Sequence, residues 1–179
     1  KNSILSICLV GKTNSGKSTF LNSIVGKNIS ITNKKKNTTI DSIIGIINQK
    51  NIQLLFYDTP GFSFINSKEN KKIKINFWNS VITSNIILYF IDVSNKNISI
   101  DKNIFNQLKK ENKKIIIILN KIDLIKKNNL LPIIDKIYKN INFSLIYPIS
   151  AKFNNGISLL IKDLLGYASK GEWIYLNNE

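Results

Sequence analysis

Runs of apolar residues alternate along the chain with segments in which apolar residues recur at helical spacing. The runs predict six strands, at residues 4–10, 43–47, 52–57, 86–92, 115–120 and 145–149. The segments between them predict helices at residues 17–25, 72–83, 102–111, 131–140 and 157–165, and Asp101 is placed to cap the third helix. This alternation is typical of an α/β domain in which helices cover both faces of a mainly parallel six-stranded sheet.

The loop after the first predicted strand has the sequence GKTNSGKS (residues 11–18), which fits the pattern G-x-x-x-x-G-K-[ST] between a strand and a helix. Gly11 and Gly16 allow the backbone to curl so that successive N–H groups point at a phosphate, in front of a helix N-terminus. Lys17 can then reach the β- and γ-phosphates, and the Ser18 hydroxyl can bind Mg²⁺. The motif predicts a nucleoside triphosphate site.

The third predicted strand ends in DTPG (residues 58–61), at the sheet edge where open α/β domains bind ligands. Asp58 is placed to hold Mg²⁺ through a water molecule. The Gly61 N–H can donate to a γ-phosphate only when that phosphate is present, so the loop that follows would distinguish triphosphate from diphosphate. Alone the tetrapeptide is an ordinary turn, and its position after the phosphate loop favours the second role.

Two further motifs, NKID (residues 120–123) and SAK (residues 150–152), follow the last two predicted strands and point to the base. The Asp123 carboxylate can accept from guanine N1–H and the exocyclic amino group, and Asn120 can donate toward O6 or N7. The Lys121 stem can lie along the ring, and the Ala151 N–H can donate to O6. Adenine would leave these groups unpaired, so the pair of motifs favours GTP over ATP.

Composition sets limits on the fold and the partners. A chain of 179 residues suits one domain with a sizeable core. No apolar run approaches the roughly 20 residues that span a bilayer, and no signal-peptide pattern precedes the first strand, so we expect a soluble, cytoplasmic protein. The lone Cys8 fits a small buried hydrophobe.

The chain has a net charge of +15, and all of its basic residues are lysines. Such a charge could attract a nucleic acid. Because Ile and Asn are also over-represented, we attribute the high lysine content mainly to a coding bias toward A- and T-rich codons.

Together the four motifs resemble the P-loop GTPases of the translation-factor-related class, in which the second strand of the sheet runs antiparallel. Three segments resemble the Era family of ribosome-assembly GTPases: NKKKNTTIDSIIGI (residues 33–46), PISAKFNNGISLLIKDLL (residues 148–165) and GEWIYLNNE (residues 171–179). The resemblance implies an Era-type GTPase domain over residues 1–166. It makes residues 167–179 a linker toward a C-terminal KH domain, the RNA-binding part of the family, which this chain does not contain.

The resemblance also implies the site residues. Phosphate binding is expected at Gly11, Lys12, Thr13, Asn14, Ser15, Gly16, Lys17, Ser18, Thr19, Asp58, Thr59, Pro60, Gly61 and Phe62. Guanine binding is expected at Asn120, Lys121, Ile122, Asp123, Ser150, Ala151 and Lys152. The expected ligands of Mg²⁺ are Ser18, Thr39 and, through water, Asp58, and the expected catalytic residues are Lys17, Thr39 and Gly61. Because Ile40 replaces the arginine usual after the second threonine, the choice of Thr39 over Thr38 is left open.

The implied activity is slow hydrolysis of GTP to GDP and phosphate. Phe62 stands where many small GTPases hold a water-orienting Gln, and a phenyl ring can neither donate to nor accept from water. The chain has no arginine, so none can act as a finger in cis. In related Era-like GTPases an Asn at the position of Asn14 coordinates K⁺ instead, although Asn14 can equally brace the loop. The lysines at residues 34–36, in the expected first switch, are either a solvated loop or an RNA contact.

The expected role is a molecular switch in small ribosomal subunit assembly and 16S rRNA maturation, with small-subunit rRNA and the 30S subunit reached through the absent KH domain. The resemblance adds peripheral membrane association as a family property, and we expect a monomer. Three alternatives stay open: the GTPase domain of a Der- or MnmE-type protein, a nucleotide-gated RNA-binding module with negligible hydrolysis, and a purely electrostatic RNA binder.

Overall fold

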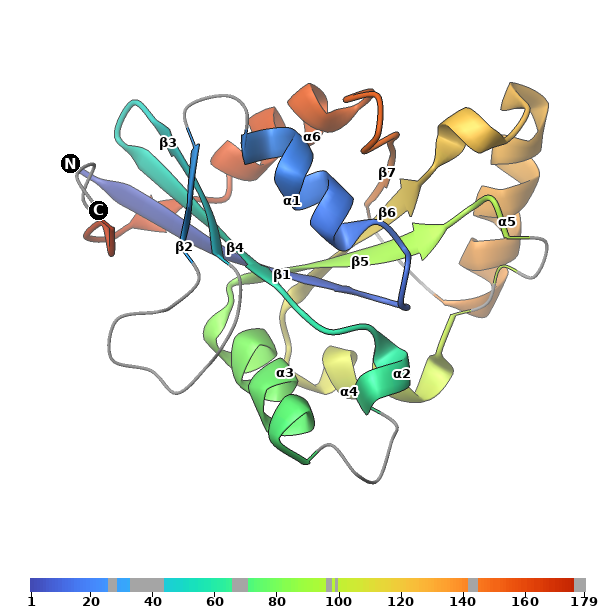
Figure 1. The fold of residues 1–179 in the computed structure, drawn as a ribbon, viewed down its shortest axis with the longest axis horizontal. Helices are drawn as coiled ribbons and strands as arrows, with labels where there is room; N and C mark the ends of the chain where they lie inside the picture. The colour runs from blue at the N-terminus through green and yellow to red at the C-terminus, as the bar shows by residue number, and fades with distance from the viewer. Residues whose placement is uncertain are drawn as a thin grey trace.

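The computed structural model describes residues 1–25, 29–32, 44–65, 71–95, 98, 100–141 and 145–175. A twisted sheet divides it into two layers of helices (Figure 1). The strands are β1 (Ser3–Gly11), β2 (Ile29–Thr32), β3 (Ile44–Gln49), β4 (Ile52–Asp58), β5 (Ile86–Asp92), β6 (Lys114–Asn120), β7 (Ile146–Pro148) and β8 (Ser169–Lys170). The α-helices are α1 (Lys17–Val25), α2 (Phe62–Ile65), α3 (Lys71–Thr83), α4 (Lys102–Lys110), α5 (Leu130–Asn140) and α6 (Ile157–Leu165), with 3-10 turns at Ile122–Leu124 and Lys127–Asn129.

The strand order is β2-β3-β4-β1-β5-β6-β7, with β8 paired to β1. Strands β4, β1, β5, β6 and β7 are parallel neighbours, whereas β3 runs antiparallel to β4. Because the carboxyl ends of parallel strands meet at one edge, the loops after β1, β4, β6 and β7 are gathered there. The order thus brings together the four sequence motifs.

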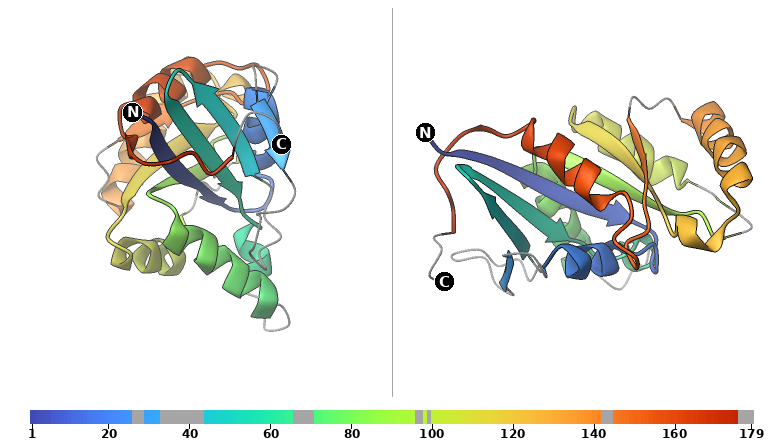
Figure 2. Two further views of the ribbon diagram at one scale, coloured as in Figure 1. Left: turned by 90° about the vertical axis from the view of Figure 1, so that its left-hand side faces the viewer. Right: turned by 90° about the horizontal axis from the view of Figure 1, so that it is seen from above.

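Alternation along the strands divides the core into two halves. Leu5, Ile7 and Leu9 of β1 face α1 and α6, whereas Cys8 and Val10 face the layer of α2, α3, α4 and α5. Figure 2 shows α1 and α6 on one side of the sheet and α3 and α4 on the other. Cys8 is fully buried, and burial raises the pKa of its thiol well above the usual range, as expected for a small hydrophobe.

The prediction of an α/β domain with an antiparallel second strand is confirmed, and α1 and α6 begin and end where expected. Asp101 caps α4 by accepting from the N–H of Ile104 at 3.1 Å. The strand count was wrong, since the described residues form a sheet of eight strands rather than six. The two missed strands, β2 and β8, have four and two residues, which is too short for a recognisable pattern of alternation. None of the helices in the described ranges is long and apolar enough to cross a bilayer.

After α6 the chain turns back across the start of β1. β8 pairs antiparallel with Ser3 and Ile4, and Tyr175 packs against Ile46, Leu55 and Tyr57 on the opposite face of the sheet from α6. The part of residues 167–179 that the structure describes is therefore packed on the domain. Whether it leads into another domain stays a prediction.

Candidate functional site: a phosphate loop joined to a base pocket

The phosphate loop follows β1 and has no room for additional side-chain atoms at its glycines. A Cβ on Gly11 would lie 2.7 Å from the carbonyl oxygen of Phe90, and one on Gly16 would overlap the amide of Asn120. Gly16 has φ +93°, a left-handed conformation that favours glycine, and Asn14 is also left-handed at φ +62°. The loop therefore requires the glycines of its motif for steric reasons.

Lys17 lies at the centre of this loop. It is 6% exposed, and its Nζ donates to the carbonyl oxygens of Lys12 at 3.1 Å and Gly11 at 3.4 Å. Burial lowers the pKa of Lys17, while the negative charge of Asp58 opposes that shift. The ammonium is thus held by two backbone carbonyl groups, where an anionic ligand would balance its charge.

Asp58 and Ser18 form the candidate magnesium centre. The Ser18 hydroxyl donates to Asp58 Oδ2 at 2.6 Å, and Asp58 Oδ1 is buried with no hydrogen-bond partner among the residues that the structure describes. Burial raises the pKa of Asp58, although the Ser18 hydrogen bond and the charge of Lys17 act in the opposite direction. A buried carboxylate oxygen without a partner beside a hydroxyl is a fitting arrangement of oxygen ligands for Mg²⁺. Thr38 and Thr39 lie outside the described residues.

The DTPG loop touches the phosphate loop directly. A Cβ on Gly61 would lie 2.5 Å from the backbone nitrogen of Thr13, and the Thr59 hydroxyl donates to the carbonyl oxygen of Leu9 at 2.6 Å. The ring of Phe62 points elsewhere, because it is 3% exposed and packs against Phe77 and Tyr89. The Phe62 side chain therefore belongs to the core, and phosphate binding at Phe62 stays a prediction.

A cavity of about 180 Å³ opens beside this loop, at the ends of β6 and β7. It is lined by Gly16, Thr19, Asn120, Lys121, Asp123, Leu124, Ala151 and Lys152. The NKID and SAK motifs, 30 residues apart in the sequence, thus form one pocket with the last glycine of the phosphate loop. Leu124, which sequence reasoning missed, is 62% exposed and offers an apolar surface to a flat ring.

Two predicted pocket residues have other roles. The side chain of Ile122 packs against the core on the α3 and α4 side and does not line the cavity. Ser150 is 1% exposed and donates its hydroxyl to Asp123 Oδ1 at 2.5 Å, so it orients that carboxylate. Guanine binding at Ile122 and Ser150 stays a prediction.

Hydrogen bonds fix the walls of the pocket. Asn120 is 1% exposed; its Nδ2 donates to the carbonyl oxygen of Ser15 at 2.9 Å, and its Oδ1 accepts from the N–H of Ala151 at 3.0 Å. Lys121, in a left-handed conformation at φ +68°, forms an ion pair of 2.6 Å with Asp92 at the end of β5. Sequence reasoning did not foresee Asp92, because a lone Asp after an apolar strand carries no distinctive signal.

The comparisons with known proteins agree with this geometry. Residues 6–121 match the family described as 50S ribosome-binding GTPase. The chain is 39% identical over 166 residues to GTPase Era of Ruminiclostridium cellulolyticum, covering 92% of this chain and 55% of that protein. It is 42% identical over 171 residues to GTPase Era of Buchnera aphidicola from Acyrthosiphon pisum, covering 94% and 60%.

Solved structures of Era have the same fold. Era in complex with MgGDPNP and nucleotides 1506–1542 of 16S ribosomal RNA superposes with a TM-score of 0.84 at 32% identity, over 100% of this chain and 61% of that one. Era of Aquifex aeolicus bound to GDP.AlF4⁻ gives a TM-score of 0.82 at 31% identity, over 99% and 61%.

The fold and the site define a P-loop GTPase domain, and the chain belongs to the 50S ribosome-binding GTPase family. Within that family its sequence and structure match the GTPase domain of Era, which confirms the resemblance to Era. The chain spans a little more than half the length of these Era proteins.

Proposed function

We propose that this protein is a GTP-binding and GTP-hydrolysing switch that acts in small ribosomal subunit assembly in the cytoplasm. The observation that carries the proposal is the Asn120 side chain, which joins the phosphate loop at Ser15 to the base pocket at Ala151. A phosphate loop alone fits many nucleotides. Tied at this spacing to a pocket that presents the Asp123 carboxylate, it fits a guanine nucleotide.

Residues of the chain itself perform most of the binding chemistry. The backbone N–H groups at the start of α1 receive the phosphates, and Lys17, held in place by two carbonyl oxygens, neutralises the β- and γ-phosphates. Ser18 and Asp58 would hold Mg²⁺, which neutralises charge on the phosphates when it is bound. Gly61 lies against Thr13 of the phosphate loop, and its N–H would detect a γ-phosphate bound there.

Hydrolysis by the isolated chain should be slow. The Phe62 ring is buried in the core and cannot orient a water molecule, and there is no arginine to stabilise the transition state. Lys17 and backbone N–H groups remain to provide electrostatic stabilisation. The left-handed Asn14 is exposed on the loop and is a candidate ligand for K⁺. Equal turnover in KCl and NaCl would remove that role for Asn14.

The RNA part of the proposal rests on Era. One Era structure contains nucleotides 1506–1542 of 16S ribosomal RNA, and we propose the same small-subunit RNA as the partner of this protein. The contact would be made through a KH domain that residues 167–179 lead into. We further propose that the protein acts as a monomer and, on the family resemblance alone, that it associates peripherally with membranes.

The experiment that tests the switch is a multiple-turnover phosphate-release assay on the 179-residue chain with GTP and ATP, alongside a Lys17→Ala variant. Turnover with GTP and not with ATP, abolished by the substitution, is the expected result. Tight GTP binding without release of even one phosphate per protein would instead indicate a nucleotide-gated binding module. Equal binding of ATP would contradict the guanine assignment.

A further inference from the structure

A second concave surface lies away from the nucleotide site, between α3 and α4. This α3–α4 groove has a volume of about 390 Å³. Its polar walls are Lys74 from α3 and Asn103, Asn106, Gln107 and Lys110 from α4, with Trp78 of α3 as an aromatic wall. Ile65 of α2 also lines it. Ile65 is the last residue of α2, and α2 begins directly after Gly61, so this short helix connects the groove to the loop that would sense the γ-phosphate.

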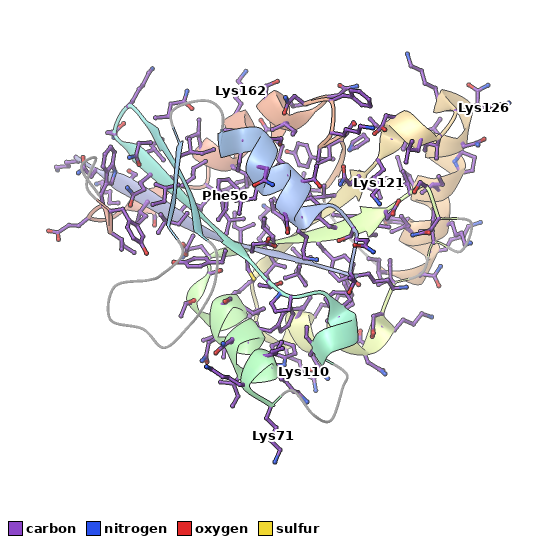
Figure 3. The ribbon with its side chains drawn as sticks, viewed as in Figure 1. Phe56, Lys71, Lys110, Lys121, Lys126 and Lys162 are labelled. Atoms are coloured by element: carbon purple, nitrogen blue, oxygen red, sulfur yellow. The ribbon has the colours of Figure 1, made fainter. Side chains whose placement is uncertain are left out.

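The lysines around the groove give it a positive charge. Helix α3 carries Lys71, Lys72 and Lys74, and α4 carries Lys102, Lys109 and Lys110, with no acidic residue inside either helix. Figure 3 shows Lys71 and Lys110 near α3 and α4, at the bottom of the view. Lys126 lies at the upper right, near α5, and Lys162 lies at the top, near α6. An anionic partner fits this surface.

Charge alone does not single out this face, because the turn and helix over residues 126–140 carry four lysines and one aspartate. What distinguishes the groove is its polar lining. Asn103, Asn106 and Gln107 are exposed on the side of α4 opposite its buried residues Ile104 and Leu108. Side-chain amides both donate and accept, so a row of them matches the edges of nucleotide bases better than it matches a carboxylate surface.

Trp78 adds a stacking surface. The indole is partly buried and packs edge-on against the fully buried ring of Phe77, with 5.1 Å between ring centroids and 88° between planes. This contact holds the indole in position in the wall of the groove. An ordered aromatic ring among lysines and amides is the combination used by single-stranded nucleic-acid sites, where bases stack on the ring and lysines follow the backbone.

We propose that the α3–α4 groove binds single-stranded RNA. Lys74 and Lys110, from opposite walls, contact phosphates, the α4 amides contact base edges, and Trp78 stacks on a base. The choice of RNA over DNA rests on the proposed ribosomal function; the site itself does not depend on GTP binding or on a KH domain.

The test uses a 12-nucleotide oligouridine RNA and the Trp173→Phe variant, in which Trp78 is the only one of the two tryptophans left. Saturable quenching of Trp78 fluorescence is expected. In the same background, Lys74→Gln/Lys110→Gln should lower the affinity about tenfold and reduce the slope of log K against log salt by about 1.4, since each phosphate contact on a single strand contributes about 0.7. The matched control, Lys126→Gln/Lys127→Gln, should change the affinity less than twofold.

Either of two results would overturn the proposal: RNA binding that leaves Trp78 fluorescence unchanged, or an equal loss of affinity in the control variant. Displacement of the RNA by polyglutamate at an equal concentration of charge would also overturn it, because that result would indicate an acidic protein partner. A fluorescent GTP analogue titrated into each variant shows that it is folded. It also separates failure of the GTP assignment in the parent chain from failure of the groove.

Discussion

Asn120 Nδ2 donates a hydrogen bond of 2.9 Å to the carbonyl oxygen of Ser15, a residue 105 positions earlier in the chain. The same side chain accepts from the Ala151 N–H, so a single buried amide fixes three loops relative to one another. Protein groups alone therefore set the spacing between the phosphate loop and the base pocket. Preorganisation of this kind lowers the entropy cost of binding.

Asn120→Ala should lower the stability of the folded protein even without nucleotide. The substitution leaves the Ser15 carbonyl and the Ala151 N–H unpaired in a buried site, at a cost of about 1–3 kcal/mol for each such group. We expect the free energy of unfolding to fall by about 2 kcal/mol or more in urea denaturation of the nucleotide-free protein. Lys152→Ala, on the exposed rim of the same pocket, is the control and should change stability by less than about 0.5 kcal/mol. Equal stability of Asn120→Ala and the parent would refute this role.

Asp123→Asn should change the base that the pocket accepts. The oxygen of the new amide can still accept from the Ser150 hydroxyl, as Asp123 Oδ1 does at 2.5 Å, which turns its NH₂ group toward the base. Guanine would then meet a donor where it needs an acceptor, whereas xanthine presents a carbonyl oxygen there. A loss of GTP affinity of about 100-fold or more is expected, with a gain for xanthosine triphosphate. Competition binding with the two nucleotides measures both, and unchanged GTP affinity would contradict the guanine assignment.

The Asp92–Lys121 ion pair predicts a pH-dependent term in stability. Burial favours the neutral acid, but hydrogen bonds from Lys121 and Ser94 outweigh it and lower the pKa of Asp92 below its ordinary value of 3.8. The stability that the pair contributes is therefore present above pH 3.8 and is lost as the pH falls through the folded-state pKa. Asp92→Asn should cost up to about 1 kcal/mol at pH 7, and the difference should vanish at lower pH.

Urea denaturation of both proteins between pH 7 and pH 3 measures that difference. Asp135→Asn, which removes an exposed carboxylate on α5, is the control and should show a smaller difference throughout. A stability difference between Asp92→Asn and the parent that grows as the pH falls would contradict the assigned direction.

The motifs predicted the site better than they predicted the roles of individual residues. Each of the four motifs lies at or just after the carboxyl end of a strand, and the parallel sheet places these ends at one edge. That the motifs come together therefore follows from the strand order. Their internal contacts do not follow from the pattern. Phe62 joins the core and Ser150 orients Asp123, because a side chain's direction depends on packing from strands and helices distant in the sequence.

Gly61→Ala should separate GTP from GDP binding. A Cβ at Gly61 would lie 2.5 Å from the Thr13 nitrogen and 2.6 Å from its Cα, both of them backbone atoms, so one of the two loops must move. Displacing Gly61 removes the N–H expected at the γ-phosphate, and we predict a loss of affinity of about tenfold for a non-hydrolysable GTP analogue and a smaller loss for GDP. Gly166→Ala is the control, because it has φ −67° and a Cβ there meets only a carbonyl oxygen at 3.2 Å. Equal losses for the two nucleotides would argue against a sensor at Gly61.

The structural role of Gln53 was not predicted from the sequence, because a single polar residue in the apolar run of β4 indicates an exposed position. The Gln53 side chain is in fact fully buried. Its Oε1 accepts from the N–H groups of Ile174 at 3.0 Å and Tyr175 at 3.2 Å, and its Nε2 donates to the Tyr175 carbonyl at 2.7 Å. An amide side chain inside the sheet face thus pairs with the backbone after β8 as a neighbouring strand would. Gln53 thus holds residues 174–175 against β4, the strand that ends at Asp58.

Gln53→Leu should release the segment, because three backbone groups would lose their partners at a cost of about 1–3 kcal/mol each if they stayed buried. Detachment exposes them to water instead, so hydrogen exchange at residues 171–175 should rise while exchange in β1 and β5 stays slow. In a Trp78→Phe background, Trp173 reports the same event by a red shift of its emission. Gln49→Leu, at an exposed position of β3, is the control and should show neither change. Unchanged exchange in Gln53→Leu would mean that the packing of Tyr175 alone holds the segment.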